Sequence, residues 1–270
     1  MAETVYDVAI IGSGPAGYTA AIRGGEYGLK VALIESAPVL GGTCLHVGCI
    51  PTKALLFNAE IWDHLKHAAE YGIAGIGTPQ LDWAAVQKRK DAIVTKHTKG
   101  LEFLMKKNKV TVISGYGKLT GPATDGIHTV ELTSTAGEVS QIKAKNLILA
   151  TGSYARTLFE QQPDDRILTN IEILALNEPP KSLIVIGAGA VGVEFGSIFR
   201  SFGTEITIVE FLPPRGSRRR RGNLQGTDAV VQKARHRCER GLQGGEDRKD
   251  RSGRQGRLDH GERKDAGEGS

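Results

Sequence analysis

Short apolar runs and longer polar-faced segments take turns along the first 210 residues of the chain. The apolar runs predict buried strands of a mostly parallel sheet, and they lie at 6–11, 31–34, 110–114, 146–150, 182–186 and 205–209. Helices are predicted over 18–27, 52–71, 82–108 and 193–202. Two alternating segments, 127–133 and 139–143, predict a hairpin. Strands that alternate with helices in this way indicate an α/β fold.

The first predicted strand leads into a glycine-rich turn. Gly12, Gly14 and Gly17 form the pattern GxGxxG between a strand and a helix, and the next strand ends at Glu35. In such a βαβ unit the first glycine permits the tight turn, the second lets backbone approach a pyrophosphate, and the third lets helix pack on strand. The pyrophosphate would sit at the helix N-terminus, and Glu35 would bind a ribose hydroxyl. Without this context, GxGxxG can also be a turn that binds nothing.

The same unit occurs a second time. Gly187, Gly189 and Gly192 repeat the pattern after a strand, and Glu210 ends the strand that follows. Glu210 comes 18 residues after the third glycine, which is also the spacing in the first unit. Two complete fingerprints predict two nucleotide sites. The carboxylate of Glu210 favours NAD over NADP, because it would repel a 2′-phosphate.

Residues 41–53 read GGTCLHVGCIPTK and contain two of the chain's three cysteines. Cys44 and Cys49 can close a small loop if the backbone there is irregular or distorted-helical, and the neighbouring glycines supply that freedom. On a helix Lys53 shares a face with Cys49, where a cation favours a thiolate or a negatively charged reduced cofactor. The spacing alone leaves two possibilities, a catalytic disulfide or two unrelated cysteines buried as small hydrophobes.

Residues 41–53 resemble the active-site segment of the flavin-dependent pyridine nucleotide–disulfide oxidoreductases. Ile50-Pro51 is most similar to the members that oxidise dihydrolipoamide, since mercuric and glutathione reductases usually have Val-Pro here. The resemblance covers residues 1–213 and implies two Rossmann-like domains that bind FAD and NAD(P), both incomplete. We assign 1–153 to the FAD-binding domain and 154–214 to the first βαβ unit of the NAD-binding domain.

The resemblance also implies roles for individual residues. Cys44 would exchange with the substrate disulfide, and Cys49 would lie against the flavin. Lys53 would sit near the flavin ring, and Glu194 near the nicotinamide. Glu35 would bind the adenosine ribose of FAD. The remaining FAD contacts implied by the resemblance are Gly117, beside the adenine, and the turn formed by Thr151, Gly152 and Ser153.

The implied reaction is a relay. Dihydrolipoamide on a lipoyl domain reduces the Cys44–Cys49 disulfide, the Cys49 thiolate passes two electrons to FAD, and NAD⁺ accepts a hydride. Such an enzyme serves 2-oxo acid dehydrogenase complexes. The alternatives are a mercuric or glutathione-type reductase, or a non-catalytic fragment with a nucleic-acid-binding tail. The family is homodimeric, but its interface domain and catalytic His are absent from these 270 residues, so we expect little lipoamide turnover.

Charge divides the chain into two unlike parts. The net charge is +5, yet residues 215–270 hold 16 of the 35 Lys and Arg residues and only 9 of the 30 Asp and Glu residues. They contain no aromatic Phe, Tyr or Trp and no apolar periodicity, so they predict a disordered basic tail. A tail led by Arg218–Arg221 can bind nucleic acid. Because residues 1–214 are near neutral, nucleic acid is not the partner we expect.

A shift of reading frame offers another interpretation of the tail. Arg and Gly codons such as AGA, CGA and GGA become acidic codons when they are read one base later. Back-translated from Gly216, the tail can then encode an acidic amphipathic helix followed by a strand, much like the continuation in the family. We hypothesise a frameshift near codons 213–215, which the gene's nucleotide sequence would test. On this hypothesis Cys238 is an accident without a partner.

Several classes of protein are excluded by simpler features. No run approaches the roughly 18 apolar residues that a membrane helix needs. The first residues lack the basic and apolar regions of a secretion signal. Three cysteines are too few for a disulfide scaffold. We therefore expect a cytoplasmic protein without membrane association and without a metal site.

Overall fold

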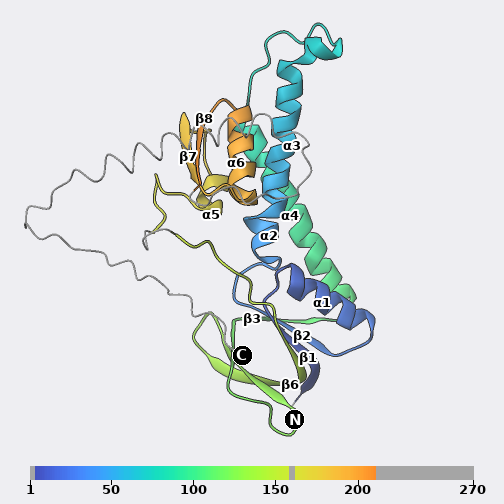
Figure 1. Cartoon of the computed structure of the whole chain (residues 1–270). Helices are drawn as coiled ribbons and strands as arrows, with labels where there is room; N and C mark the ends of the chain where they lie inside the picture. Colours follow the sequence, from blue (N-terminus) through green and yellow to red (C-terminus); the bar gives the residue numbers. More distant parts are fainter. Residues whose placement is uncertain (1–3, 158–161, 211–270) are drawn as a thin grey trace, which may run out of the picture.

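The computed structural model describes residues 4–157 and 162–210 (Figure 1). The interpretations of 215–270 as a basic tail, and of Cys238, lie outside these residues. A main sheet occupies the lower part of Figure 1, and two long helices rise from it beside a second, smaller sheet. The described residues form an α/β fold with a βαβ unit in each of its two sheets.

The main sheet has six strands in the order β3-β2-β1-β6-β5-β4. Strands β3, β2, β1 and β6 run parallel, whereas β4 and β5 are antiparallel to their neighbours. The order 3-2-1 followed by a return strand is that of a Rossmann-like half. The strands span β1 Val5–Ile11, β2 Val31–Glu35, β3 Thr111–Ser114, β4 Tyr116–Leu119, β5 His128–Thr133 and β6 Val139–Leu149.

Helices connect these strands and a second unit follows them. The helices are α1 Pro15–Glu26, α2 Gly42–His46, α3 Cys49–Lys66, the 3₁₀ turn η1 Ala68–Tyr71, and α4 Trp83–Lys107. The second unit comprises α5 Asn170–Leu174, β7 Ser182–Ile186, α6 Ala190–Ser201 and β8 Glu205–Val209, with β7 and β8 paired in parallel. None of the helices in the described residues is long and apolar enough to cross a membrane.

Alternation along the central strands gives the main sheet two apolar faces. Ile10 and Leu33 point to one face, where they pack in a cluster with α1 and α4 residues such as Met105. Ala9 and Ile34 point to the other face and pack with Val130 and Leu132 of β5 and Ala144 of β6. The antiparallel strands therefore cover the face that carries no helix in this part of the chain.

The structure corrects several predicted elements. The segments 139–143 and 146–150 belong to one continuous strand, β6, because β5 pairs with residues 139–144, β1 pairs with residues 143–149, and the two pairings overlap. Strand β4 and helices α2 and α5 were not predicted, since each is only four or five residues long. Helix α1 begins at Pro15, where a missing N–H costs no hydrogen bond, rather than at 18. Helix α3 ends at Lys66 and a 3₁₀ turn takes residues 68–71.

The strands predicted as buried are partly bare. Leu149 at the end of β6 is 61% exposed, and Ile184 and Ile186 of β7 are 67% and 69% exposed. Nothing in the described residues covers these faces, so an apolar run in these strands does not show that its side chains are buried. This expectation from the apolar pattern was wrong for β6 and β7.

Two adjacent glycines inside α1 have a steric reason. Each costs roughly 1 kcal/mol of helix stability relative to Ala. A Cβ on Gly24 would lie 2.8 Å from a methyl of Val31, and a Cβ on Gly25 would lie 2.4 Å from the backbone oxygen of Asn108. Real Cβ atoms do not approach other heavy atoms so closely, so the glycines let α1 pack against β2 and against the end of α4.

The second unit docks on α3 and α4 through its own apolar cluster. Leu55 of α3 and Trp83 of α4 pack there with Phe195 and Phe199 of α6, and all four are buried. Trp83 Nε1 and Gln87 Nε2, one helical turn apart, both donate to the Leu176 oxygen at 2.8 Å. These contacts fix the second unit against the two helices that follow the cysteine segment (Figure 1).

Candidate functional site

The first glycine turn is shaped as the pattern predicts. Gly12 has φ +100°, and a Cβ there would lie 2.2 Å from the Ala150 oxygen. A Cβ on Gly17 would lie 1.8 Å from the Gly12 oxygen, so only glycine lets α1 begin this close to the turn. Nothing lies within 4 Å of a Cβ on Gly14. Helix α1 carries neither a capping side chain nor an acid in its first turn, so its N-terminus can receive an anion.

Glu35 lies against this turn. Its Oε2 accepts hydrogen bonds from the Ser13 N–H at 2.8 Å and the Ser13 hydroxyl at 2.6 Å, and its Oε1 accepts from the Ala37 N–H at 2.8 Å. Burial raises the pKa of Glu35, but these hydrogen bonds outweigh burial and hold the pKa below its usual value. The carboxylate is therefore ionised at neutral pH and oriented at the turn.

The cysteine segment begins directly on the glycine turn. Gly41 donates its N–H to the Ser13 oxygen at 3.1 Å, and a Cβ on Gly42 would lie 2.7 Å from the Gly14 Cα. Both glycines have positive φ, at 125° and 63°. The predicted nucleotide turn and the two cysteines are thus joined by backbone contacts that tolerate no side chain.

Cys44 lies in α2 and Cys49 is the first residue of α3. The helical backbone is interrupted between them at Val47 and Gly48. The irregular or distorted-helical backbone that a small loop between the cysteines requires is present, since the helical backbone is interrupted between α2 and α3. Both cysteines are free thiols, and their side chains lie in contact with each other. Burial raises the pKa of the Cys44 thiol and contact with Cys49 raises it further, whereas the backbone N–H of Cys49 acts in the opposite direction.

One turn beyond Cys49, Lys53 reaches the second unit. Its Nζ lies 2.5 Å from Oε1 of Glu194 on α6, a residue 141 positions away in sequence. Both side chains are partly exposed. The docking of α6 on α3 therefore brings together the cation and the acid that the sequence assigned to two different cofactors.

The second glycine turn repeats the geometry of the first. Gly187 has φ +96°, and a Cβ on Gly192 would lie 2.4 Å from the Gly187 oxygen. A Cβ on Gly189 meets nothing within 4 Å, and α6 has no capping side chain. Glu210 accepts from the Ala188 N–H at 2.8 Å, as Glu35 accepts from the Ser13 N–H.

The remaining predicted positions lie around the end of β6. Gly117 lies in β4, where a Cβ would crowd Ile34 at 3.2 Å. The exposed residues that follow β6 are Thr151, Gly152 and Ser153, and Gly152 has φ +75°. The Ala150 N–H donates to the Ile11 oxygen at 2.8 Å, which places this turn beside the first glycine turn. Their roles in binding FAD stay a prediction.

Sequence reasoning missed three residues that hold this site together. Ser13 is fully buried and binds Glu35, His46 places Nε2 2.8 Å from the Leu40 oxygen, and Asn170 donates to the Val47 oxygen at 2.7 Å. Ser13 and His46 lie at positions that the glycine and cysteine patterns leave open, and Asn170 lies in neither pattern, so only the fold reveals their contacts.

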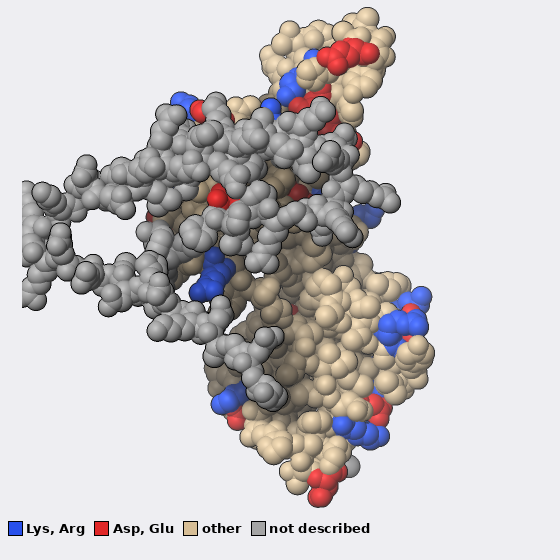
Figure 2. Space-filling view, in the orientation of Figure 1, with Lys and Arg blue, Asp and Glu red and all other residues tan. Residues whose placement is uncertain are grey.

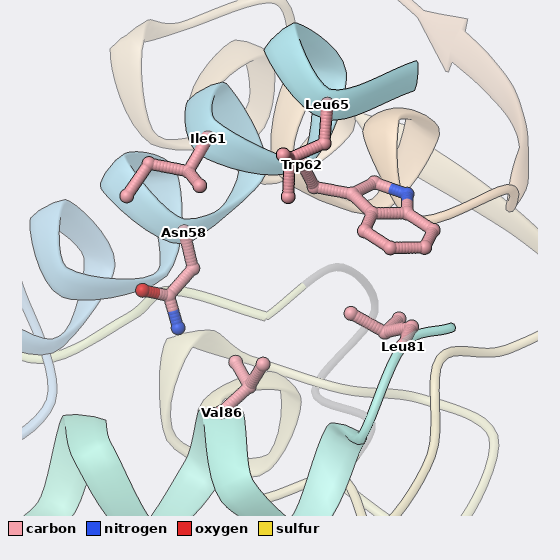
Figure 3. Close-up of a pocket in the computed structure, with 6 residues that line it drawn as sticks. All are labelled: Asn58, Ile61, Trp62, Leu65, Leu81 and Val86. Carbon is pink, nitrogen blue, oxygen red and sulfur yellow. The ribbon is translucent and has the colours of Figure 1, made fainter. Parts of the chain in front are cut away.

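Three further features of the described residues, namely a pocket, the possible metal ligands and the surface charge, add nothing to the site at the cysteine segment. A pocket of about 170 Å³ lies between α3 and α4, starting nine residues beyond Cys49, and it is lined by Asn58, Ile61, Trp62, Leu65, Leu81 and Val86 (Figure 3). No group of three or more His, Cys, Asp or Glu side chains among residues 4–157 and 162–210 could hold a metal ion. In the view of Figure 2, charges of both signs are scattered in small groups over the described surface.

Comparison with known proteins accounts for this arrangement. The family model described as pyridine nucleotide-disulphide oxidoreductase matches residues 6–219. The chain belongs to this family. Among curated members, it is 46% identical over 218 residues to a dihydrolipoyl dehydrogenase of Cupriavidus necator, covering 77% of this chain and 44% of that protein. It is 44% identical over 207 residues to the mitochondrial dihydrolipoyl dehydrogenase of Pisum sativum, covering 76% and 40%.

A solved structure supports the fold. LpdA from Mycobacterium tuberculosis matches with a TM-score of 0.70 and 26% identity, covering 88% of this chain and 50% of that chain. The chain thus spans about half the length of the relatives it matches. The predicted Rossmann-like α/β class is confirmed.

Proposed function

We propose that the chain is the nucleotide-binding part of an NAD-dependent dihydrolipoyl dehydrogenase, in which Cys44 and Cys49 cycle between dithiol and disulfide. One observation carries the proposal. The two thiols lie in contact across the α2–α3 break, and the start of α2 at Gly41 and Gly42 is held by backbone contact against the first glycine turn. A redox pair fixed beside a dinucleotide site can exchange electrons with a cofactor bound there.

The first unit fits the FAD that this function requires. Gly14 faces open space, the α1 N-terminus is uncapped, and Glu35 is ionised beside them. The weakest bond to Glu35 comes from the exposed Ser36 hydroxyl at 3.4 Å, so a ribose hydroxyl can take its place. When bound, the flavin would supply an acceptor for the two electrons of the dithiol. These residues would hold its pyrophosphate and adenosine ribose.

The second unit fits NAD on the same grounds. Gly189 faces open space at the uncapped start of α6, and Glu210 directly follows β8. A carboxylate there accepts from ribose hydroxyls and repels a 2′-phosphate. These features favour NAD over NADP and therefore favour dihydrolipoyl dehydrogenase over NADPH-dependent reductases of the family.

The cysteines would accept electrons from dihydrolipoamide by thiol–disulfide exchange. A substrate thiolate attacks the Cys44 sulfur, forming a mixed disulfide and releasing Cys49. The second thiol of the substrate then attacks the substrate sulfur that is bonded to Cys44. This closes the lipoamide disulfide and releases the Cys44 thiol. Two electrons and two protons pass from substrate to protein. Because its pKa is raised, Cys44 keeps its proton at neutral pH.

A half-reaction tests the proposal with the chain as it exists. The Cys238→Ser variant is oxidised and then mixed anaerobically with one equivalent of dihydrolipoamide. We expect a Cys44–Cys49 disulfide before mixing, and afterwards two protein thiols and one lipoamide, detected by alkylation and mass spectrometry. A Cys44→Ser control in the same background should form no internal disulfide. A wild-type disulfide that dihydrolipoamide leaves intact would overturn the proposal.

A further inference from the structure

The loop between the two cysteines is held from outside by Asn170. Its Nδ2 donates to the Val47 oxygen at 2.7 Å, across 123 positions of sequence. Val47 lies in the break between α2 and α3, three residues after Cys44 and two before Cys49. The bond joins the segment that leads into the second βαβ unit directly to the redox loop.

Asn170 is itself firmly placed. It is the first residue of α5, and Thr169 and Glu172 form a capping box in which Oε2 of Glu172 accepts from the Thr169 N–H at 2.6 Å. At the other end of α5 the buried Lys90 donates to the Leu174 oxygen at 2.7 Å. Helix α5 is therefore fixed at both ends, and the position of the Asn170 amide follows from it.

The carbonyl that Asn170 binds lies in the interruption between the two helices. Helix α2 is only five residues long, so the Val47 carbonyl lies beyond its last turn and needs an outside partner. The next residue, Gly48, has φ −140° and ψ −119°, and glycine has access to many other conformations. Yet a Cβ on Gly48 would lie 2.8 Å from the Thr43 oxygen, so the loop is tight in this one arrangement.

We propose that Asn170 is a positioning residue for the Cys44–Cys49 pair, and that it couples the docking of the second unit to the redox loop. The proposal rests on the proposed redox role of the two cysteines. With the Val47–Gly48 peptide fixed, the thiols stay adjacent and close to a disulfide with little rearrangement. Without the amide, this peptide can rotate and the two thiols can separate. The dithiol form then gains conformational entropy, which is lost when the disulfide closes, so the disulfide becomes less stable.

The equilibrium with glutathione measures this effect. One oxidised glutathione takes two electrons and two protons from the cysteine pair, giving two reduced glutathione molecules and the disulfide. In the Cys238→Ser background we expect Asn170→Ala to weaken the disulfide about fivefold, the effect of one typical hydrogen bond. This corresponds to a reduction potential about 20 mV less negative.

Two further variants separate positioning from general destabilisation. Asn170→Asp keeps the shape but replaces the donor by an oxygen that repels the Val47 carbonyl, so its shift should be at least as large, and it carries the test if Asn170→Ala does not fold. Asn108→Ala removes the same type of bond, from Nδ2 to the Leu104 oxygen at 2.9 Å, at the end of α4. This control should leave the glutathione equilibrium unchanged.

The outcomes distinguish this proposal from the function it rests on. If the wild-type cysteines form no mutual disulfide at any glutathione ratio, the proposed function fails. If they do, but the folded Asn170→Ala and Asn170→Asp variants show the wild-type equilibrium, only the role of Asn170 is overturned. Equal shifts in these variants and in the Asn108→Ala control would also overturn it, since the effect would then be general.

Discussion

Replacing Ser13 by Ala should weaken the fold around the first nucleotide turn by a definite amount. The Ser13 hydroxyl is buried, donates to the Glu35 carboxylate at 2.6 Å and accepts from the Gly41 N–H at 3.1 Å. A hydrogen bond to a charged group contributes about 1.5–3 kcal/mol. The Gly41 N–H keeps its second acceptor, the Ser13 backbone oxygen, so no donor is left unpaired.

The second unit shows what the variant would look like. Ala188 occupies the position of Ser13, and its backbone N–H donates to Glu210 with no hydroxyl beside it. We therefore expect Ser13→Ala to leave the turn intact and to lower the free energy of unfolding by about 2 kcal/mol at pH 7. Urea denaturation followed by circular dichroism measures this difference.

The pH dependence provides a stricter check. The pKa of Glu35 is lowered in the folded chain, so the stability due to its ionised form is present above its unfolded pKa and is lost as pH falls through the folded pKa. The cost of Ser13→Ala should then shrink toward about 1 kcal/mol, the value for a neutral bond. Ser36→Ala, which removes only the exposed 3.4 Å bond to Glu35, should cost little at any pH. Equal losses in the two variants would refute the reasoning.

Three further outcomes follow from the packing and charges. Cys49→Ala should lower the pKa of Cys44 toward its ordinary value, because burial remains but the raising contact with Cys49 is gone, and iodoacetamide alkylation at pH 8 should be faster than for Cys44 in the wild type. Gly25→Ala should destabilise the chain by about 1–3 kcal/mol, because the new Cβ clashes with the backbone of Asn108. Gly100→Ala should stabilise it by about 0.5–1 kcal/mol, because a Cβ there meets nothing within 4 Å and Ala favours the helix. Thermal melts measure both changes. Burial raises the pKa of Asp63, but hydrogen bonds from a lysine and a serine outweigh it and lower the pKa, so Asp63→Asn should reduce Tm at neutral pH and have a smaller effect as pH falls below about 4. An Asp63→Asn effect that grows on acidification would contradict this assignment.

Much of the fold could be predicted from local sequence. The two βαβ units follow from glycines whose positions are fixed by backbone contact, as at Gly12 and Gly17, and from acids at the strand ends. Short elements such as α5 could not be predicted, because five residues give no periodicity and the helix is stabilised by packing and caps. The exposure of Ile184 was also beyond the pattern, since apolar character does not reveal whether anything covers a strand.

The candidate site was predictable where one segment carries it. The cysteine pair and Lys53 lie within the 13-residue segment 41–53, so their motif is visible in the sequence. The partner of Lys53 was assigned only to the second nucleotide site, and the link between Asn170 and the redox loop was not foreseen. Both contacts depend on how the second unit docks on α3, and that docking comes from buried residues spread over four helices.

The central claim is that the cysteine pair delivers electrons to a flavin held at the first glycine turn. The most direct measurement is the visible absorbance of the purified chain after equilibration with FAD, desalting and anaerobic titration with dihydrolipoamide. The account predicts about one bound flavin per chain, reduced by the substrate in the wild type and left oxidised in Cys44→Ser. A chain that retains no flavin, or a bound flavin that the substrate reduces equally well in Cys44→Ser, would contradict it.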